Sequence, residues 1–339
     1  MKPDSYSNAY QRACKALDQK TKPPGSLGQL EKIAAQLSAL QNTLTPTATK
    51  ARTLIFAADH GVVAEGISAY PQDVTRQMLL NFATGGAAIN AICNAHQIEL
   101  EVINTGVCGE PVDGVLNYKI ANGTANFSKS SSMTKPQLQQ ALTAGDEAID
   151  RAKAQDVTIV AIGEMGIGNT TSAAAMVAAI CEVPSAKTTG RGTGLDDAGV
   201  THKQKIVDQS LTLHSSRKPI DILQHLGGFE IAAMCGAMLR CVDTPIAIVV
   251  DGYIATAAAL CATKINPQVQ QHLIFAHQSA EPGHIIALDH LNANPLLQLE
   301  LCLGEGSGAA LAIPLIRSAV AILNDMATFE SAGVDREIS

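Results

Sequence analysis

Hydrophobic positions change their spacing near Arg52. Before that point the chain predicts two helices joined by a turn, because apolar side chains recur every three or four positions along one face of the second helix. These positions are Leu27, Leu30, Ile33, Leu37 and Leu40. Ser26 and Gln29 have the spacing of a capping box, which predicts the start of this second helix.

Beyond residue 52, short apolar runs are followed by glycine-rich turns and alanine-rich stretches, an alternation that indicates a parallel α/β sheet. The runs predict strands at 53–58, 99–104, 157–162, 246–250 and 273–276. Because these runs are continuously hydrophobic, we expect helices on both faces of the sheet. The principal helices are predicted at 74–82, 137–154, 171–181, 229–239 and 309–321.

The domain organisation follows from this change of pattern and from the length of 339 residues, which exceeds one comfortable core. We predict a small helical domain from residues 1–45 and a large α/β domain from residues 46–308. A C-terminal helix, 309–339, is expected to return to the small domain. The segment 106–136 has the weakest pattern, and we interpret it as an excursion at a sheet edge.

Composition and charge exclude several classes of protein. Hydrophobic residues make up 46% of the chain and charged residues 16%, which is typical of a folded globular protein. The net charge of -7 and the lack of basic clusters argue against nucleic acid as a partner. The apolar stretches 246–262 and 309–323 are interrupted by Asp251 and Arg317, which favours buried core over membrane spans.

The chain ends and the cysteines add two expectations. The polar N-terminal residues lack the apolar segment of a secretion signal, so a cytoplasmic location is expected. The eight cysteines never form a C-x-x-C pair, and we interpret them as reduced, mainly core residues rather than metal ligands. They are Cys14, Cys93, Cys108, Cys181, Cys235, Cys241, Cys261 and Cys302.

Candidate chemistry follows the predicted strands. In open α/β sheets the ligand crevice lies beyond the carboxyl ends of the strands, and here those positions are polar. Asp59 and His60 follow the first strand, the turn 163–171 follows the third, Asp251 follows the fourth and 277–284 follows the fifth. We therefore expect four turns to line one mouth.

Two glycine-rich turns suit an anion. The turn 163–171 precedes an alanine-rich helix and would aim backbone N–H groups at a phosphate, although Asn169 or Thr170 as a simple helix N-cap remains the alternative. The segment 190–197 precedes a second helix containing Lys203, and its alternative is a linker with a surface lysine. Together the two turns indicate a phosphorylated small molecule.

Glu305 lies between glycines in the segment 303–308, where it is either a general base or a helix-capping acid. His60 and His284 are interpreted as hydrogen-bonding residues that order loops, because no metal-ligand spacing surrounds them. No metal and no cofactor are expected.

Seven segments in order carry a family resemblance over nearly the whole chain. They are KPPGSLGQLE at 22–31, AADHGV at 57–62, SAYPQ at 68–72, GEMGIGNTT at 163–171, GRGTG at 190–194, SAEPGH at 279–284 and LGEGSG at 303–308. The chain resembles the nicotinate-nucleotide:dimethylbenzimidazole phosphoribosyltransferase family. The resemblance implies a Rossmann-like, mostly parallel sheet flanked by helices, with a small helical domain formed by both terminal segments.

The implied activity is transfer of phosphoribosyl from nicotinate mononucleotide to 5,6-dimethylbenzimidazole, with inversion at C1′, by a homodimer. The resemblance makes Glu305 the catalytic base and Glu164 a second acidic residue beside the reacting groups. It places Ser68 and Gln77 at the base pocket. The remaining implied substrate-binding residues are Met165, Gly166, Gly168, Asn169, Thr170, Gly190, Gly192, Lys203, Asp251, Ser279, Leu303 and Gly304.

Cys302 departs from the pattern, because the family is expected to carry arginine there. The sequence does not show which base is the preferred acceptor, so 5-methylbenzimidazole, adenine and phenolic acceptors stay open beside dimethylbenzimidazole. Two other classes of function also stay open, a small-molecule kinase and a non-catalytic nucleotide sensor.

Overall fold

A six-stranded sheet, parallel throughout, forms the centre of the computed structural model, which describes residues 3–192 and 194–335. The strands are β1 (Ala51–Ala58), β2 (Glu99–Gly106), β3 (Leu116–Asn117), β4 (Ile159–Met165), β5 (Ala247–Val250) and β6 (Leu273–Phe275). Their order is β3-β2-β1-β4-β5-β6, the order of a Rossmann-like sheet. The predicted α/β class is confirmed.

All five predicted strands are present, with shifted ends. The main shift concerns β4, which runs to Met165, so Glu164 and Met165 belong to the strand instead of the turn after it. The predicted excursion at 106–136 contains β3, a two-residue strand that pairs with β2 at the sheet edge. Two exposed residues offer no hydrophobic period, which is why the pattern did not predict this strand.

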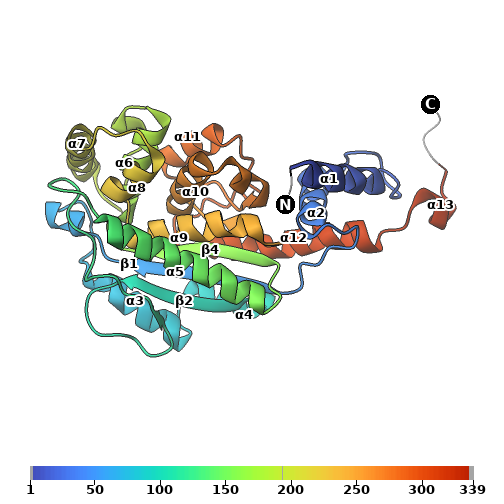
Figure 1. Ribbon diagram of the computed structural model, residues 1–339, viewed down its shortest axis with the longest axis horizontal. Helices are drawn as coiled ribbons and strands as arrows, with labels where there is room; N and C mark the ends of the chain where they lie inside the picture. The colour runs from blue at the N-terminus through green and yellow to red at the C-terminus, as the bar shows by residue number, and fades with distance from the viewer. Residues whose placement is uncertain (1–2, 193, 336–339) are drawn as a thin grey trace.

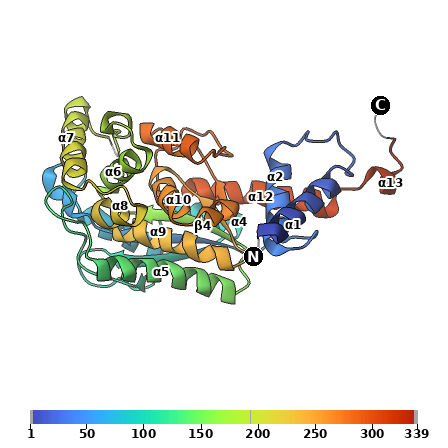
Figure 2. The ribbon, with the colours of Figure 1, turned by 45° about the horizontal axis from the view of Figure 1, so that its top comes forward.

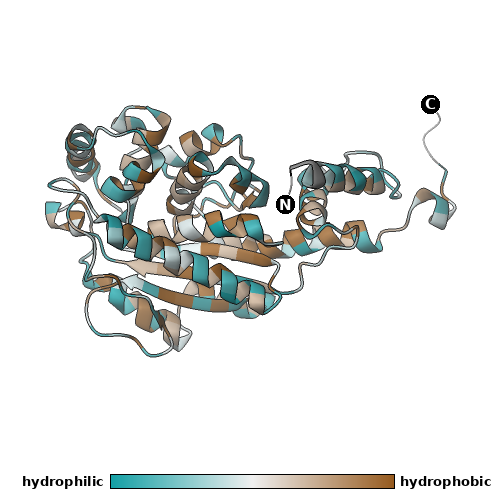
Figure 3. Cartoon of the chain, in the orientation of Figure 1, coloured by the Kyte–Doolittle hydropathy of each residue, from teal (hydrophilic) through white to brown (hydrophobic). Residues whose placement is uncertain are grey.

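Alternate side chains of the strands enter two separate cores. Leu54 and Phe56 of β1 pack in the core with α5 (Lys135–Ala154), α6 (Asn169–Cys181), α9 (Phe229–Arg240) and α10 (Tyr253–Ile265). Ile55 and Ala57 face the other core, with α3 (Asp73–Thr84), α4 (Ala88–His96) and α12 (Ser307–Asp325). The hydropathy colouring of Figure 3 shows hydrophobic residues gathered in β4 and mixed faces on α5. Burial on both faces explains the continuous apolar runs.

Three further helices lie near the end of the sheet that carries the site. They are α7 (Asp197–Leu213), α8 (Pro219–Leu226) and α11 (Pro282–His290). Short 3-10 turns complete the chain at Gly61–Glu65, Ser185–Lys187, Cys241–Asp243 and Pro267–His272. Figure 2 shows α6, α7 and α11 standing together beyond the sheet.

The N-terminal helices α1 (Pro3–Leu17) and α2 (Gln29–Gln41) pack against each other and against α12, away from the sheet (Figure 1). Ile33, Leu37 and Leu40 are buried in this contact, whereas Leu27 and Leu30 are half-buried. The last helix of the described residues is α13 (Phe329–Ala332). Helix α12 packs against β4 and β5 and also against α2, so this helix joins the two groups of elements.

The predicted capping box is wrong. Helix α2 begins after Gly28, whose φ of 56° is left-handed, and no side chain caps the helix. Instead Glu31 reaches back from the first turn and accepts the N–H of Leu27 at 2.9 Å. Lys22 holds the same carboxylate at 2.7 Å. A carboxylate one turn inside the helix therefore takes the place predicted for Ser26.

Helix α12 is long and apolar enough to span a membrane by composition, yet 56% of its most apolar stretch is buried inside the protein. Arg317 donates hydrogen bonds to backbone carbonyls, including that of His96 at 2.6 Å. A charged side chain tied to the neighbouring loops identifies α12 as a core helix, as predicted.

The eight cysteines are all free thiols, also as predicted. Four of them are buried: Cys93, Cys235, Cys241 and Cys261. Cys14, Cys108 and Cys181 are half-buried, and Cys302 lies exposed in the loop before α12, so half of the cysteines are buried core residues.

Candidate functional site

The candidate site lies at the carboxyl ends of β1 and β4, where the chain connections pass to opposite sides of the sheet. This switch point is where ligands bind in open α/β sheets. Glu164 is the penultimate residue of β4, and Glu305 lies in the turn that starts α12. The fold thus joins two acidic residues that are far apart in the sequence.

A backbone hydrogen bond joins the two glutamates, and neighbouring glycines allow their close approach. The N–H of Glu305 donates to the backbone carbonyl of Glu164 at 3.2 Å. A side chain at Gly304 would overlap the carboxyl group of Glu164, and one at Gly163 would overlap the backbone of Gly306. The close approach therefore requires glycine at positions 163 and 304. Glu305 itself has a left-handed φ of 66°, so the turn stores backbone strain at this residue.

Burial makes both glutamates weaker acids than usual. Burial, and then the charge of Glu230, raise the pKa of Glu164 to about 8, although the amide of Asn169 opposes this shift. Burial also raises the pKa of Glu305, partly offset by the backbone N–H of Ile89. Oε2 of Glu305 is buried and has no hydrogen-bond partner among the described residues. These carboxyl groups are suited to take up and release protons near neutral pH.

Asp251 orders the loop that carries Glu305. Its carboxylate accepts the N–H of Gly306 at 3.2 Å and that of Ala309 at 2.9 Å, and it thereby caps the N-terminus of α12. Burial raises the pKa of Asp251 to about 7, while these backbone N–H groups oppose the shift. Asp251 was predicted as a substrate-binding residue; in the structure both of its oxygens accept N–H groups at the start of α12, and its role toward substrate stays a prediction.

A pocket opens beside this pair, at the N-terminus of α6. Its lining residues are Ile67, Ser68, Gly166, Ile167, Gly168, Asn169, Thr170, Arg191, Gly192, Leu195 and Lys203. The helix begins at Asn169 with Gly168 as N-cap, so the alternative that Asn169 or Thr170 is the N-cap is wrong. A helix N-terminus carries partial positive charge and attracts anions.

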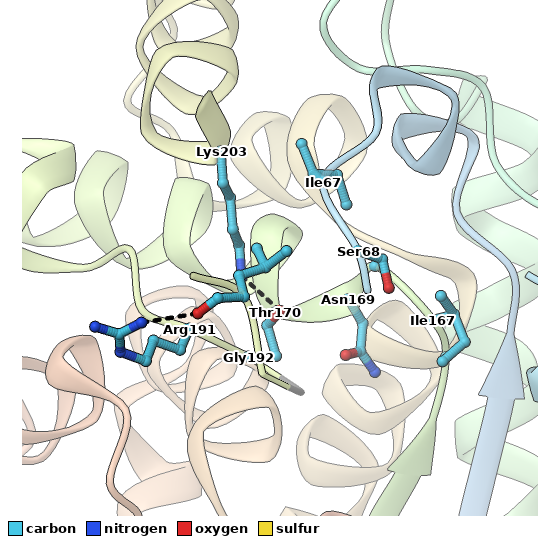
Figure 4. A pocket seen from close by; sticks show the side chains of 11 residues that line it. Ile67, Ser68, Ile167, Asn169, Thr170, Arg191, Gly192 and Lys203 are labelled. Carbon is cyan, nitrogen blue, oxygen red and sulfur yellow. Dashed lines mark hydrogen bonds between the residues drawn. The ribbon is translucent and has the colours of Figure 1, made fainter. Parts of the chain in front are cut away.

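Lys203 supplies a buried positive charge to the pocket, beside the exposed Arg191. It reaches from α7 to donate a hydrogen bond to the Thr170 hydroxyl at 2.8 Å (Figure 4). Its side chain is buried, which excludes the surface-lysine alternative. Burial lowers the pKa of Lys203 to about 8, an effect that the charge of Glu281 opposes. A bound anion would favour the charged lysine further.

Seven of the predicted substrate-binding residues line this pocket: Ser68, Gly166, Gly168, Asn169, Thr170, Gly192 and Lys203. Gly190 is adjacent, and its carbonyl accepts a bond from Lys203 at 3.4 Å. Gly304 contacts Glu164, and Met165 ends β4 beside it. Gln77 and Leu303 are exposed and are not among the lining residues.

The remaining predicted residues order loops. Ser279 donates its N–H to Nδ1 of His284 at 2.9 Å, and Nε2 of that ring meets the Thr256 hydroxyl at 2.9 Å. His60 pairs with Glu230 at 2.6 Å, fully buried. The interpretation of both histidines as hydrogen-bonding residues is confirmed. Within the described residues, no group of three or more potential ligands could hold a metal ion.

Sequence reasoning missed four lining residues, Ile67, Ile167, Arg191 and Leu195, and it missed Glu230 as a neighbour of Glu164. Arg191 and Leu195 lie inside or beside the glycine-rich segment 190–194, so their position was a usable signal. Glu230 gave no such signal, because only the packing of α9 on the sheet brings it to the site.

The buried carboxyl of Glu164 should make stability depend on pH. A carboxyl whose pKa rises from 4.5 to about 8 on folding binds a proton that the unfolded chain has released. The free energy of unfolding is therefore expected to fall as pH rises through this window, by up to about 1.4 kcal/mol per pH unit. Urea titrations of the wild type and Glu164→Gln across the window measure this slope. The variant should have the shallower slope, and equal slopes would contradict the raised pKa.

Together the fold and the site define a Rossmann-like α/β protein with an anion pocket beside paired buried glutamates. The family model described as phosphoribosyltransferase matches residues 3–334. The chain belongs to this phosphoribosyltransferase family, whose members are glycosyltransferase-type enzymes, and the resemblance inferred from its motifs is confirmed.

Individual relatives are similar to this chain over nearly their full length. A protein of Ralstonia nicotianae named nicotinate-nucleotide--dimethylbenzimidazole phosphoribosyltransferase is 48% identical over 327 residues, 95% of this chain and 92% of the relative. A protein of the same name from Pseudomonas putida strain F1 is 50% identical, and the match covers 93% of this chain and 91% of that protein. The crystal structure of CobT from Thermus thermophilus has a TM-score of 0.93 at 45% identity, with coverage of 97% of this chain and 100% of that one.

Proposed function

We propose that the chain transfers the phosphoribosyl group of nicotinate mononucleotide to 5,6-dimethylbenzimidazole, releasing nicotinate and α-ribazole 5′-phosphate. One observation carries the proposal: a pocket with a buried lysine lies beside two buried glutamates at the switch point of the sheet. The relatives at 48% and 50% identity bear the name of this activity. The reaction belongs to assembly of the nucleotide loop of cobalamin.

The phosphate is assigned to the pocket. Lys203, the hydroxyl of Thr170 and the N-terminus of α6 are suited to bind its charged oxygens. From there the ribose can extend toward the carboxyl groups of Glu164 and Glu305. The base is assigned to the side of Ser68 and Gln77, with Leu303 at the entrance. Binding of the phosphate far from C1′ would hold the reacting carbon in place.

Glu164 is proposed to stabilise positive charge at C1′. Nicotinate mononucleotide already carries a pyridinium leaving group, and its departure builds oxocarbenium character on the ribose. The raised pKa of Glu164 means that the empty site holds a proton there. A cationic ring beside it favours the ionised form, so substrate binding should release this proton. The resulting carboxylate faces the developing charge.

Glu305 is proposed as the general base. Attack by a benzimidazole nitrogen on the face opposite the pyridinium inverts C1′ from β to α. As the new bond forms, positive charge spreads over the imidazole ring, and its remaining N–H becomes acidic. The unpartnered Oε2 of Glu305 is suited to accept this proton.

Cys302 does not disturb this arrangement. Its thiol lies 3.6 Å from the carbonyl of Glu300, in the exposed loop before Gly304. The backbone contact of Glu305 with Glu164 and the capping by Asp251 involve other residues. An arginine at this position would add one positive charge at the entrance of the site, so its replacement bears on binding and leaves the proposed base in place.

A homodimer, a cytoplasmic location and the division into 1–45, 46–308 and 309–339 are proposed from the family resemblance and the chain pattern. Sedimentation velocity tests the dimer by giving a mass of twice 35.3 kDa. Fractionation of cells tests the location. Limited proteolysis of the full chain tests the domain division.

The experiment for the activity is incubation of the purified protein, without added metal, with nicotinate mononucleotide and dimethylbenzimidazole. Chromatography and mass spectrometry should find nicotinate and the ribotide in equal amounts. A panel of 5-methylbenzimidazole, adenine and phenolic acceptors then ranks the bases. Phosphate transfer from ATP would instead support a kinase, and nucleotide binding without any turnover would support a sensor.

A further inference from the structure

Glu281 already accepts a hydrogen bond from one of the backbone N–H groups of the anion pocket. In the segment 190–195, the N–H groups of Gly194 and Leu195 both donate to the carbonyl of Arg191. The N–H of Gly192 is directed elsewhere and donates to Oε1 of Glu281 at 2.8 Å. Gly192 is a lining residue of the pocket. A carboxylate from the start of α11 thus holds the amide that an incoming phosphate would use.

The same carboxylate provides the negative charge near Lys203. A buried lysine needs an anion to remain protonated, and the charge of Glu281 acts in that direction on Lys203. Gly190 makes room for it, because a side chain there would overlap Oε2 of Glu281. Gly190 and Gly192 therefore adjoin one anion that belongs to the protein, and Lys203 lies close enough to feel its charge.

This internal contact is incomplete. Oε2 of Glu281 is buried and has no hydrogen-bond partner among the described residues. An unpaired buried carboxylate oxygen destabilises the arrangement that contains it. A phosphate brings three oxygens and more charge to the same donors, so it can satisfy groups that the carboxylate leaves unpaired. The arrangement is suited to exchange of one anion for another.

We infer that Glu281 holds the place of the substrate's phosphate in the unliganded protein and competes with it for the N–H of Gly192 and the charge of Lys203. The inference rests on the proposed function, which assigns this pocket to the phosphate. The carboxylate keeps the loop ordered and the lysine charged when no ligand is bound. It also weakens the pocket for every phosphate ligand, including the ribotide product, and so favours product release.

The test is calorimetric titration with inorganic phosphate and with nicotinate mononucleotide. Glu281→Gln retains an oxygen for the N–H of Gly192 and removes the competing charge. It is expected to bind both anions about tenfold more tightly than the wild type. Glu330→Gln removes the same charge from the distant, exposed α13 and should leave both affinities unchanged. Equal or weaker binding by a folded Glu281→Gln would overturn the inference.

A wild-type crystal structure with nicotinate mononucleotide provides a test that needs no variant. The carboxylate of Glu281 should have left the N–H of Gly192, and a phosphate oxygen should have taken its position. If the carboxylate keeps this bond while a phosphate is bound in the pocket, the inference about Glu281 is overturned and the proposed function is not. If inorganic phosphate binds equally well to Lys203→Met, the assignment of the pocket fails, and the inference fails with it.

Discussion

Glu305→Gln is expected to lower kcat for phosphoribosyl transfer by about 10² to 10⁴, the usual contribution of a general base. The amide keeps the size of the side chain and an oxygen for the N–H of Ile89, so the turn before α12 should persist. It cannot accept the proton that the benzimidazole ring must lose. Binding of nicotinate mononucleotide should change little, because that proton belongs to the second substrate.

Glu300→Gln is the matched control for this variant. Glu300 lies in the same loop, also has a positive φ, of 55°, and is exposed. Its substitution removes the same charge without touching the proposed base, so the rate should stay near that of the wild type. Steady-state kinetics over a range of pH measures both variants. A Glu305→Gln enzyme with full, pH-independent activity would contradict the assignment.

Lys203→Met is expected to reduce kcat/KM for nicotinate mononucleotide by about 10- to 100-fold, because charged hydrogen bonds contribute about 1.5 to 3 kcal/mol. Most of the loss should be in KM, since the phosphate does not react and is bound alike before and during transfer. Methionine fills the buried space without a charge, so the protein should remain folded.

Lys205→Met provides the comparison, because Lys205 is exposed on the same helix two residues further along. It changes the net charge equally and should bind substrate as the wild type does. Initial rates at varied nicotinate mononucleotide separate KM from kcat. An unchanged KM for Lys203→Met would move the phosphate out of this pocket.

The sheet could be predicted because strands that are buried on both faces need continuous apolar runs, such as residues 54–56 in β1. The glycine turns at 163–171 and 190–194 were visible for a similar reason, since close backbone approach demands glycine. Elements that need neither continuous apolar runs nor glycine could not be predicted from the sequence. The edge strand β3 is the example, with two exposed residues paired to β2.

The candidate site was predicted only as separate pieces and by family resemblance. The contact between Glu164 and Glu305 depends on how α12 packs against β4, which no local pattern encodes. Asp251 was predicted at the site because it follows a strand, but its capping of α12 could not be predicted, since the start of α12 comes more than fifty residues later. Glu230 enters the site through the packing of α9. Long-range packing therefore sets the protonation of the site.

The configuration at C1′ of the product tests the central claim most directly. Purified enzyme should convert β-configured nicotinate mononucleotide and dimethylbenzimidazole into a ribotide that proton NMR identifies as the α anomer, with one nicotinate released for each. That result is expected if the base attacks opposite the leaving pyridinium between Glu164 and Glu305. A β-configured ribotide, or nicotinate released without any ribotide, would contradict the account.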